Sequence, residues 1–396
     1  MDILCFSTTD WDEIWGSRQQ IMKRLAAAGQ RVLFVERQVG PEALLRDPAL
    51  RRRKLEAWRR PALRRLEANL WAWNPPLLPP GRYYSPALNA LGQRLLAGRA
   101  RPVLQGLGFE RPLLWLYPPQ SAPLLGRFGE RLSVYHCIER FAGEQRGRKR
   151  STMLRLEEEL LRAADLVFVH SEGLRRLYAP LTRRPIRLAP SAADVAHYQS
   201  DASLHPALAA LPSPRLVVMG TLDQRLDLEL LGCLARSRPG WQIALVGQVR
   251  SARVDLGPLA NLPNVHLFGK RPYDELPALL NAADACLVPY VLNELTRYIN
   301  PLKVYEYLAS GKPVVSSDLP EVRALAPWVR IAPQAGPGAQ ERAQAFAGEV
   351  ERALAEDSPG LQDGRRMAAR EHSWEGRVAA MWAAVQECLE GDEGAP

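Results

Sequence analysis

The sequence predicts an α/β protein built from two doubly wound, Rossmann-like halves. Apolar runs of strand length alternate with helical patterns along almost the whole chain, which is typical of a mostly parallel sheet covered by helices. A polar, proline-bearing stretch near the middle interrupts this alternation, which then starts again. The length of 396 residues suits two domains better than one.

Six strands and at least four helices are predicted in the first half. The strands are apolar runs bounded by turn residues, and the helices show apolar residues at helical spacing. Ser17 suits the N-cap of the first helix, and Gly29 suits its end. The predicted strands are residues 3–7, 32–36, 70–73, 113–117, 133–137 and 166–170. The predicted helices include residues 17–28, 86–97, 150–163 and 171–178.

The second half repeats the alternation. The predicted strands are residues 215–219, 242–246, 265–268, 285–289 and 313–316, and the predicted helices are 226–235, 273–282, 301–310, 340–354 and 374–389. The expected divisions are an N-terminal domain over 1–197, a linker over 198–214, a C-terminal domain over 215–373, and a final helix with a polar tail over 374–396. We expect this final helix to cross back to the N-terminal domain.

Composition and the start of the chain predict a cytoplasmic protein. Hydrophobic residues make up 47% of the chain, as is usual for a globular protein. No apolar run reaches the ~18 residues that suggest a membrane span. The first residues, MDILCFSTTD, lack the basic region and cleavage pattern of a signal peptide and predict a strand. Five cysteines are scattered without metal-ligand spacing, as expected for reduced core thiols.

Basic residues are in excess and unevenly placed. The net charge of +9 suggests anionic partners. Residues 46–65, RDPALRRRKLEAWRRPALRR, carry nine basic residues interleaved with leucine and tryptophan, and a second cluster, RGRKR, covers 146–150. These stretches form either a solvated basic surface or, for 46–65, a patch that lies on anionic lipid headgroups at the inner face of the plasma membrane. Nucleic acid is the least favoured partner, because no nucleic-acid-binding signature accompanies the charge.

Residues 300–315, NPLKVYEYLASGKPVV, predict a short helix followed by a buried strand. Asn300 suits the N-cap and Pro301 the first helical position. Lys303 and Glu306 lie three residues apart and therefore share one helix face. The free N–H groups of the first turn and Lys303 would hold an anion such as a diphosphate, and Glu306 suits a pair of sugar hydroxyls such as a ribose diol. The plainer alternative is a surface ion pair.

Other candidates follow predicted strands of the second half. Arg225 comes just after the strand RLVVM, and a guanidinium suits phosphate oxygens. Lys270 and Arg271 come directly after the strand VHLF and its glycine. The chain has six lysines against 46 arginines, so the lysines at strand or helix ends, Lys270, Lys303 and Lys312, are candidates, with chance surface lysines as the alternative.

In the first half, the loop after the first strand carries Trp15, Gly16, Ser17 and Arg18. Backbone amides at this helix start would face an anionic group, although packing is an equally plain role for the tryptophan. The loop lacks G-x-G-x-x-G, so a nicotinamide or flavin site of the usual kind is not expected.

His136 and Glu139 lie near the carboxyl end of the strand SVYHC and are candidate catalytic groups. A packed, hydrogen-bonded histidine is the alternative. In open α/β sheets, ligands bind beyond the carboxyl ends of the strands. Two such sheets are expected to face each other across a cleft, with one ligand on each wall.

Several segments resemble glycosyltransferases with the GT-B fold. In the second half these are GKRPYDELPALLNAADACLVPY and ELTRYINPLKVYEYLASGKPVVSSDLPEV, and in the first half WGSRQQIMKRLAAAGQRVLFVE, LLWLYPP and SVYHCIERF. The resemblance covers most of residues 1–390 and is closest to the family-four-like bacterial enzymes that build exopolysaccharide and teichuronic acid chains.

The resemblance implies transfer of a sugar from a nucleotide-diphosphate donor, with no metal and no cofactor. It implies that Glu306 holds the ribose and that Arg225 and Lys303 meet the diphosphate. The implied donor-binding residues are Lys270, Arg271, Thr296, Asn300, Leu302, Lys303 and Glu306. The implied acceptor-side residues are Trp15, Gly16, Ser17 and Arg18, and the catalytic candidates are His136, Glu139, Arg225 and Lys303.

The sequence departs from the family pattern at two places. The family has a second Glu eight positions before the ribose-binding one, and Tyr298 stands there; Glu294 is near but has the wrong spacing. His136 stands where related sequences usually carry Asp. Both departures leave the donor sugar and the stereochemistry open.

The predicted function is that of a glycosyltransferase in cell-surface polysaccharide synthesis. It would move a sugar from a UDP-sugar or related donor to a glycan or lipid-linked acceptor, with retention favoured. Two alternatives keep the fold: a nucleotide-sugar epimerase or hydrolase, and a catalytically silent subunit that docks on a membrane or on a partner transferase.

Overall fold

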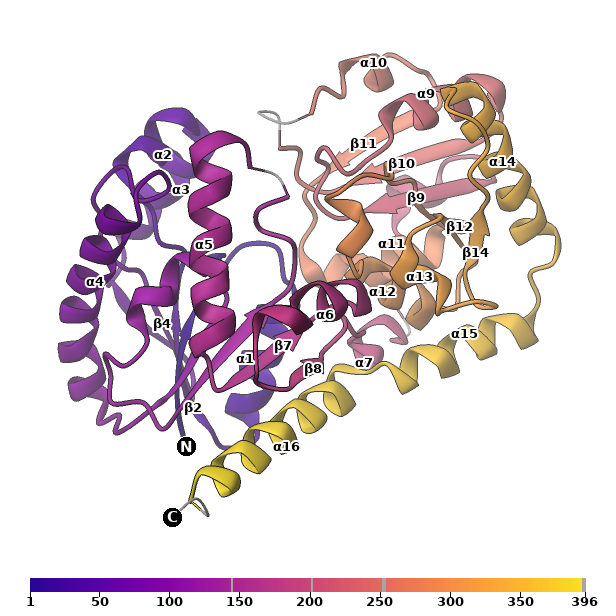
Figure 1. Ribbon diagram of the computed structural model, residues 1–396. Helices are drawn as coiled ribbons and strands as arrows, with labels where there is room; N and C mark the ends of the chain where they lie inside the picture. Colours follow the sequence, from indigo (N-terminus) through magenta and orange to yellow (C-terminus); the bar gives the residue numbers. More distant parts are fainter. Residues whose placement is uncertain (144, 201, 251–253, 394–396) are drawn as a thin grey trace. The chain divides into compact units, whose positions relative to one another are not determined.

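The computed structural model describes residues 1–143, 145–200, 202–250 and 254–393. The chain divides into two compact units, one made of residues 1–190 with 378–396 and the other of residues 191–377. Each unit contains one sheet with helices against it (Figure 1). Within the described ranges, no helix is long and apolar enough to cross a membrane.

The first unit is built on an eight-stranded sheet in the order β3-β4-β2-β1-β5-β6-β7-β8. All neighbouring strands are parallel except β3 and β4. The strands are β1 Asp2–Phe6, β2 Arg31–Val35, β3 Leu63–Glu67, β4 Leu70–Trp73, β5 Leu113–Leu116, β6 Leu132–Cys137, β7 Leu166–Val169 and β8 Ile186–Leu188. The central strands are buried on both faces, as the uninterrupted apolar runs predicted.

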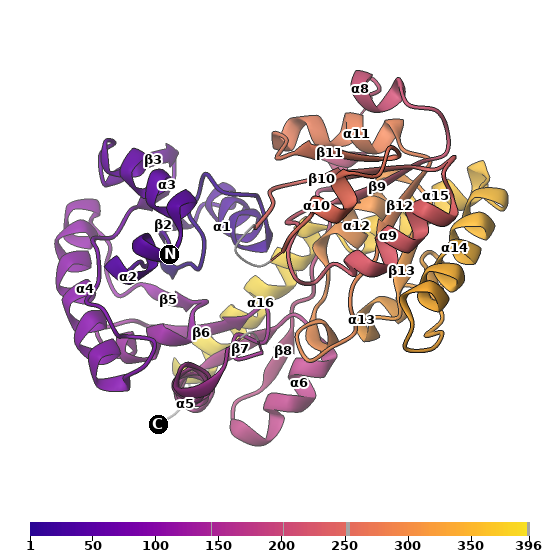
Figure 2. The ribbon, with the colours of Figure 1, turned by 90° about the horizontal axis from the view of Figure 1, so that it is seen from above.

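Helices cover both faces of this sheet, with α4 and α5 on one side and α1 on the other (Figures 1 and 2). The helices are α1 Ser17–Ala27, α2 Pro41–Arg46, α3 Pro48–Trp58, α4 Pro86–Leu107, α5 Gly147–Ala163 and α6 Glu172–Tyr178, with 3-10 turns η1 Pro119–Leu124 and η2 Ala179–Leu181. The long α4 has clear end signals: Ser85 accepts a hydrogen bond from the Leu88 amide, and Gly108 ends the helix in the left-handed conformation.

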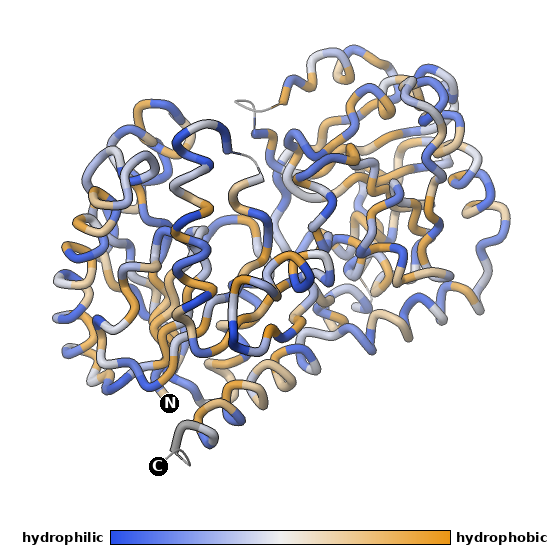
Figure 3. Tube along the Cα trace, viewed as in Figure 1, coloured by the Kyte–Doolittle hydropathy of each residue, from blue (hydrophilic) through white to orange (hydrophobic). Residues whose placement is uncertain are grey.

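The second unit has a six-stranded sheet in the order β11-β10-β9-β12-β13-β14, and all its neighbouring strands are parallel. The strands are β9 Arg215–Met219, β10 Gln242–Val246, β11 Val265–Gly269, β12 Ala285–Val288, β13 Val314–Ser317 and β14 Arg330–Ala332. Hydrophobic residues concentrate on these strands, while the helices alternate between hydrophobic and hydrophilic residues (Figure 3).

The helices of the second unit are α7 Val195–Tyr198, α8 Pro206–Ala209, α9 Leu228–Ser237, α10 Gly257–Ala260, α11 Leu276–Ala282, α12 Leu302–Ser310, α13 Pro320–Arg323, α14 Ala339–Ala355 and α15 Pro359–Glu371, with 3-10 turns η3 Tyr273–Glu275 and η4 Thr296–Tyr298. The last helix, α16 Trp374–Glu393, belongs to the first unit from Val378 onward. Along that part, Glu387 pairs with Arg187 at 2.9 Å.

The predicted two-domain α/β class is confirmed, whereas the structure draws some boundaries differently. The second unit begins at Ser191 and includes residues 198–214, which the sequence analysis assigned to a linker. In that segment Leu208 is fully buried, and the His205 amide donates to the Ala278 carbonyl at 3.0 Å. The segment therefore packs against the rest of the second unit through a few buried residues, although its polar composition suggested a linker.

The basic stretch 46–65 is mostly helical, and it packs against the loop after β1. The Lys54 ammonium is almost fully buried and donates to Asp10 at 2.8 Å. Arg53 pairs with Glu13 at 3.3 Å. Arg60 and Arg64 both pair with Asp12, and Arg64 also pairs with Glu36. Much of the positive charge of this stretch is therefore matched within the first unit.

Candidate active site

Three neighbouring strands of the second sheet end in glycines with positive φ. These are Gly220 after β9, Gly247 after β10 and Gly269 at the end of β11, with φ of 115°, 150° and 69°. The approach is closest at Gly247, where an added Cβ would lie 1.7 Å from the Gly220 carbonyl oxygen. Glycine is therefore required at position 247, and because it has no side chain, the backbone itself forms the surface at this edge of the sheet.

Alanine at position 247 is expected to destabilise the protein by at least about 2 kcal/mol, because both the clash and the positive φ oppose it. Gly269→Ala is the matched control. Position 269 also has positive φ but open space for a Cβ, so we expect a cost of only about 1 kcal/mol. Thermal unfolding of both variants measures the difference, and equal losses would contradict the close approach.

Helix α12 begins at Leu302 and ends at Gly311, which adopts the left-handed conformation. Asn300 was predicted to cap this helix, but the structure places Pro301 at the N-cap without a side-chain cap. The Asn300 side chain instead accepts from the Ser191 amide at 2.9 Å and donates to the Tyr305 hydroxyl at 3.1 Å. Asn300 therefore fixes the chain before the helix, and its predicted donor contact stays a prediction.

Lys303 lies in the first turn of α12 and is 8% exposed. Its Nζ makes no hydrogen bond of full geometry to any described residue. It lies 5.0 Å from the centroid of the Tyr290 ring, and a Cβ added to Gly220 would be 3.1 Å from it. A nearly buried ammonium that makes no full hydrogen bond is costly, so the position favours an anionic ligand.

Arg225 approaches the same tyrosine. Its guanidinium carbon is 6.0 Å from the centroid of the Tyr290 ring. The guanidinium also pairs with Asp223 at 2.6 Å, which leaves the arginine held in place. Burial alone would raise the pKa of Asp223, but the hydrogen bonds and charge of Arg225 outweigh it and lower that pKa. The structure thus brings Arg225 and Lys303 together around Tyr290.

The pKa of Tyr290 is affected by the positive charges of Lys303 and Arg225. Burial acts to raise the pKa of its hydroxyl, but the charges of Lys303 and Arg225, together with the approach of the Lys303 ammonium to the hydroxyl as a hydrogen-bond donor, outweigh burial and lower that pKa below the ordinary value. Sequence analysis missed this residue. The available signal was its position directly after the apolar strand β12, in the same kind of loop as Arg225.

Glu306 lies one turn further along α12 and is 9% exposed. Burial raises the pKa of its carboxyl to about 7, while the Tyr198 hydroxyl and the Lys303 charge act in the opposite direction. No ion pair within 4.0 Å joins Lys303 to Glu306 in the described chain. The alternative of a solvated surface pair is therefore wrong, because both groups are nearly buried and neither neutralises the other at contact distance.

An aromatic group lies on the α7 side of Glu306. The His197 ring stacks on Tyr273 at 3.9 Å, and its Nε2 is 3.0 Å from the Tyr273 carbonyl oxygen. Tyr198 packs edge-on against both rings. Tyr273 comes just after the Lys270–Pro272 segment, so these rings join the predicted donor loop to the carboxylate. Sequence analysis missed Tyr198, which lies in the assumed linker, and His197, which was assigned to the end of the N-terminal domain.

The remaining predicted donor residues have varied surroundings. Lys270 is exposed, and Arg271 pairs weakly with Glu275 at 3.9 Å. The Thr296 hydroxyl is fully buried and donates to the Val291 carbonyl, so it holds its own loop. Leu302 is half-buried at the first position of α12.

In the first unit, His136 is fully buried within an aromatic cluster. Its ring stacks on Tyr117 at 4.9 Å and contacts Trp115 and Phe168. Burial, with the charges of His170 and Arg18, lowers the pKa of His136 well below its ordinary value. Neither ring nitrogen has a hydrogen-bond partner among the described residues. The histidine is thus packed, as in the alternative to a catalytic role, but within the described chain it is not hydrogen-bonded as that alternative expected.

Arg18 lies at the start of α1, with its guanidinium carbon 5.6 Å from the centroid of the Tyr117 ring. Burial lowers its pKa, and the charge of half-buried Glu139 acts in the opposite direction. The structure therefore places Arg18 and Glu139 in one electrostatic neighbourhood at the carboxyl edge of the sheet. Gly16 precedes the helix, Ser17 is its first residue, and Trp15 packs on Trp11 with ring centroids 5.7 Å apart.

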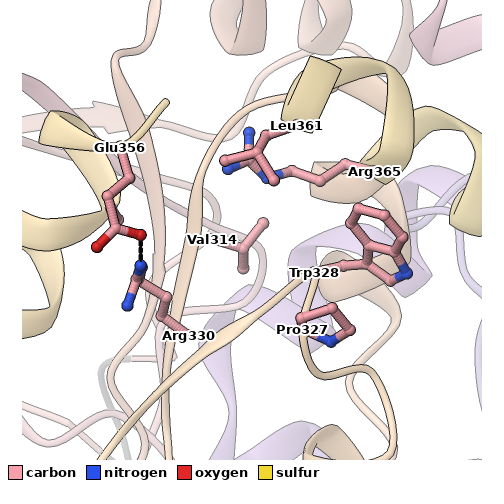
Figure 4. A pocket seen from close by; sticks show the side chains of 8 residues that line it. Val314, Pro327, Trp328, Arg330, Glu356, Leu361 and Arg365 are labelled. Atoms are coloured by element: carbon pink, nitrogen blue, oxygen red, sulfur yellow. Dashed lines mark ion pairs between the residues drawn. The ribbon is translucent and has the colours of Figure 1, made fainter. Parts of the chain in front are cut away.

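A cavity of about 170 Å³ lies elsewhere in the second unit, near the amino ends of β13 and β14. Val314, Trp328, Arg330, Glu356 and Arg365 are among its lining residues (Figure 4). Arg330 pairs with Glu356, and Arg365 pairs with Asp357. Because these charges are matched and the cavity is at the opposite ends of the strands from Lys303, it is no part of the candidate site.

Comparison with known proteins shows which families and folds this chain is similar to. Residues 213–356 match the family described as Glycosyl transferases group 1. A Bacillus subtilis (strain 168) protein named as a candidate teichuronic acid biosynthesis glycosyltransferase, TuaH, is 25% identical over 227 residues. These residues are 53% of this chain and 56% of that protein, so the match spans little more than half of the relative's length.

Solved structures share the fold over nearly the whole chain. A sucrose-phosphate synthase from Thermosynechococcus elongatus gives a TM-score of 0.72 at 19% identity, covering 98% of this chain and 99% of that one. Anabaena HepE in complex with UDP and glucose gives 0.66 at 16% identity, covering 98% and 100%. The resemblance predicted from the sequence is confirmed: the chain has the GT-B fold, and its second unit carries a glycosyl transferases group 1 domain.

Proposed function

We propose that the protein is a glycosyltransferase that takes a sugar from a nucleoside-diphosphate donor bound by its second unit. The observation that carries this proposal is the nearly buried Lys303 ammonium at the start of α12, which makes no hydrogen bond of full geometry to the described residues. A diphosphate would supply that acceptor, and the free N–H groups of the helix start would add to the attraction. Arg225, held by Asp223, would contribute the second positive charge.

Each donor group has a matching position. Glu306 lies one turn beyond Lys303 and would accept hydrogen bonds from the ribose diol. The aromatic rings of His197 and Tyr273 and the backbone after β11 would meet the base. A UDP-sugar is the favoured donor, supported by the fold shared with a protein solved in complex with UDP and glucose.

Catalysis would rely mainly on stabilising the nucleoside diphosphate as it leaves. As the glycosidic bond breaks, negative charge builds on the phosphate oxygen, and Lys303, Arg225 and the helix start would stabilise that charge. In this proposal the leaving diphosphate would be stabilised without a metal ion.

The acceptor would be a glycan or a lipid-linked glycan held by the first unit, where Trp15, Gly16, Ser17 and Arg18 lie at the sheet's carboxyl edge. Retention is the favoured outcome. If the enzyme inverts the anomeric centre, Glu139 is a better base than the fully buried His136. A lipid-linked acceptor would place the protein at the inner face of the membrane.

Donor binding gives the direct test. UDP and UDP-sugars are expected to raise the melting temperature, because ligands that bind only the folded state stabilise it. ADP-, GDP- and dTDP-sugars serve as comparison compounds in the same screen. Turnover that needs an added glycan or lipid-linked acceptor supports a transferase. Turnover without an acceptor would identify an epimerase or hydrolase, and binding without any turnover would identify a silent subunit.

A further inference from the structure

The first unit exposes an apolar ridge on α4. Leu88, Leu91 and Leu95 are 42%, 48% and 52% exposed. Their spacing of i, i+3 and i+7 puts them on one face of the helix. Isolated exposed leucines are common, but three in a row on one helix face are a typical mark of an interaction surface. We call these three residues the α4 ridge.

The α4 ridge continues onto α2. Tyr84, just before α4, is 44% exposed, and its hydroxyl is 3.5 Å from the Arg46 guanidinium at the end of α2. Beside Arg46, Leu45 is 78% exposed. Figure 2 shows α2 next to α4 in the first unit. The apolar surface therefore spans two helices.

Basic residues surround this surface. Arg94 and Arg99 are exposed on α4 beside the ridge, and Arg46 lies at its α2 side. The Lys149 ammonium is 4.8 Å from the centroid of the Tyr83 ring, which brings the start of α5 to the same place. Arg148 in that turn is exposed. The structure thus joins the cluster 146–150 to the end of α2, although they are a hundred residues apart in the sequence.

Acidic residues are almost absent from the segments that form this surface. Residues 81–107, which include all of α4, contain no Asp or Glu, and neither do residues 146–151. Helix α2 has Glu42, but both of its carboxylate oxygens are buried and lie against Gly40. The described surface of α2, α4 and the start of α5 is therefore apolar in its centre and positively charged at its edges.

We propose that this surface docks on an anionic lipid bilayer. Exposed leucines and a tyrosine would enter the headgroup region, and arginine and lysine at the edges would contact lipid phosphates. A second copy of the chain is the weaker occupant, because two identical surfaces with basic edges and no exposed acid would repel each other. A lipid surface has the opposite charge and needs no matching shape.

This proposal places the membrane contact away from most of the stretch 46–65, for which the sequence analysis gave a lipid-binding patch as one of two alternatives. In that stretch Lys54 is buried, and Arg53, Arg60 and Arg64 are paired with acids of the first unit. Leu55 and Trp58 on α3 remain 50% and 40% exposed and provide a matched control surface.

Flotation with phosphatidylcholine vesicles, with and without phosphatidylglycerol, tests the proposal on the full chain. The wild type is expected to bind only the anionic vesicles. The triple variant Leu88→Ser, Leu91→Ser, Leu95→Ser is expected to lose binding. Arg94→Gln with Arg99→Gln should weaken binding by about fivefold for each charge removed. The control Leu55→Ser with Trp58→Ser is expected to bind like the wild type.

Two further readouts keep the result interpretable. Melting temperatures, together with UDP binding by the second unit, show that each variant is folded, and donor binding is independent of the vesicle result. The proposal is overturned if the folded triple variant still floats or if the α3 control loses binding instead. It is also overturned if the wild type is a dimer that the triple variant converts to a monomer without any vesicle binding.

Discussion

Replacing Lys303 by methionine is expected to weaken donor binding strongly and, at the same time, to stabilise the free protein. Methionine has a similar length and no charge. It removes an ammonium that is 8% exposed and makes no hydrogen bond of full geometry to the described residues. Burying such a charge costs free energy in the empty protein, and that cost disappears with the methionine. The melting temperature without ligand is therefore expected to rise.

Donor binding should change in the opposite direction. A hydrogen bond to a charged phosphate contributes roughly 2–3 kcal/mol, which corresponds to about 30- to 150-fold in affinity. Turnover is expected to fall further than affinity, because Lys303 also stabilises the charge that develops on the leaving diphosphate. Calorimetric titration with UDP and steady-state kinetics measure the two losses separately.

Lys312→Met is the matched control. Lys312 follows the same helix, but its ammonium donates to the Asn281 carbonyl at 2.9 Å. Its replacement removes an existing hydrogen bond, so we expect a lower melting temperature and unchanged UDP affinity. If Lys303→Met lowers the melting temperature as Lys312→Met does, or leaves UDP affinity intact, then Lys303 has a structural role and the diphosphate assignment is wrong.

The parts of the fold that were predicted from the sequence are those decided by local pattern. The central strands β1, β5, β9 and β10 are buried on both faces, so their sequences are continuous apolar runs. Short edge strands carry no such signal. In β3, for example, the sequence LRRLE is partly exposed along its length and has no run to detect.

The candidate site was predictable where one segment carries the chemistry. Lys303, Glu306 and the helix start lie within a few residues of one another, and Arg225 follows a strand whose carboxyl end was recognisable. Tyr290 and Tyr198 reach the same place only through the tertiary fold. Their contacts with Lys303 and Glu306 depend on which strands are neighbours, and a single sequence does not contain that information.

The basic stretch shows the same limit for charge. Nine basic residues between 46 and 65 suggested an open anionic-lipid patch. Their partners Asp10, Asp12 and Glu13 are about forty residues earlier in the chain and become neighbours only when the sheet forms. Charge clusters are visible in a sequence, whereas their neutralisation is a property of the folded chain.

Replacing Glu306 by alanine is expected to weaken UDP binding by roughly 2–3 kcal/mol, because two ribose hydroxyls would lose a charged acceptor. The same carboxylate should make binding depend on pH. Burial raises the pKa of Glu306 to about 7. Ribose hydroxyls favour the ionised form, so below that pH a proton must leave before the donor binds. The affinity for a UDP-sugar should therefore fall by up to about tenfold per pH unit on acidification.

A UDP-sugar is the right probe, because its diphosphate is a diester and has no group that titrates in this range. Calorimetry in buffers of different ionisation enthalpy should show release of nearly one proton at a pH one unit below the pKa of Glu306 and almost none above it. Glu306→Gln should abolish the release. Glu294→Gln, an exposed carboxylate from the preceding loop, serves as the control and should retain the release.

The free energy of unfolding of the ligand-free protein should change with pH in the opposite direction to the donor affinity. Because the pKa of Glu306 is raised from 4.5 to about 7 in the folded protein, the folded state binds more protons than the unfolded chain between these values. The contribution of Glu306 to the free energy of unfolding is therefore fully present below pH 4.5, falls as pH rises through this window, and is lost above about 7. Glu306→Gln should remove this slope. The two pH effects are linked, because the empty site penalises the ionised carboxylate that the ribose requires. If the stability and the donor affinity of the wild type are both independent of pH from 4.5 to above 7, then Glu306 is neither buried as described nor the ribose acceptor.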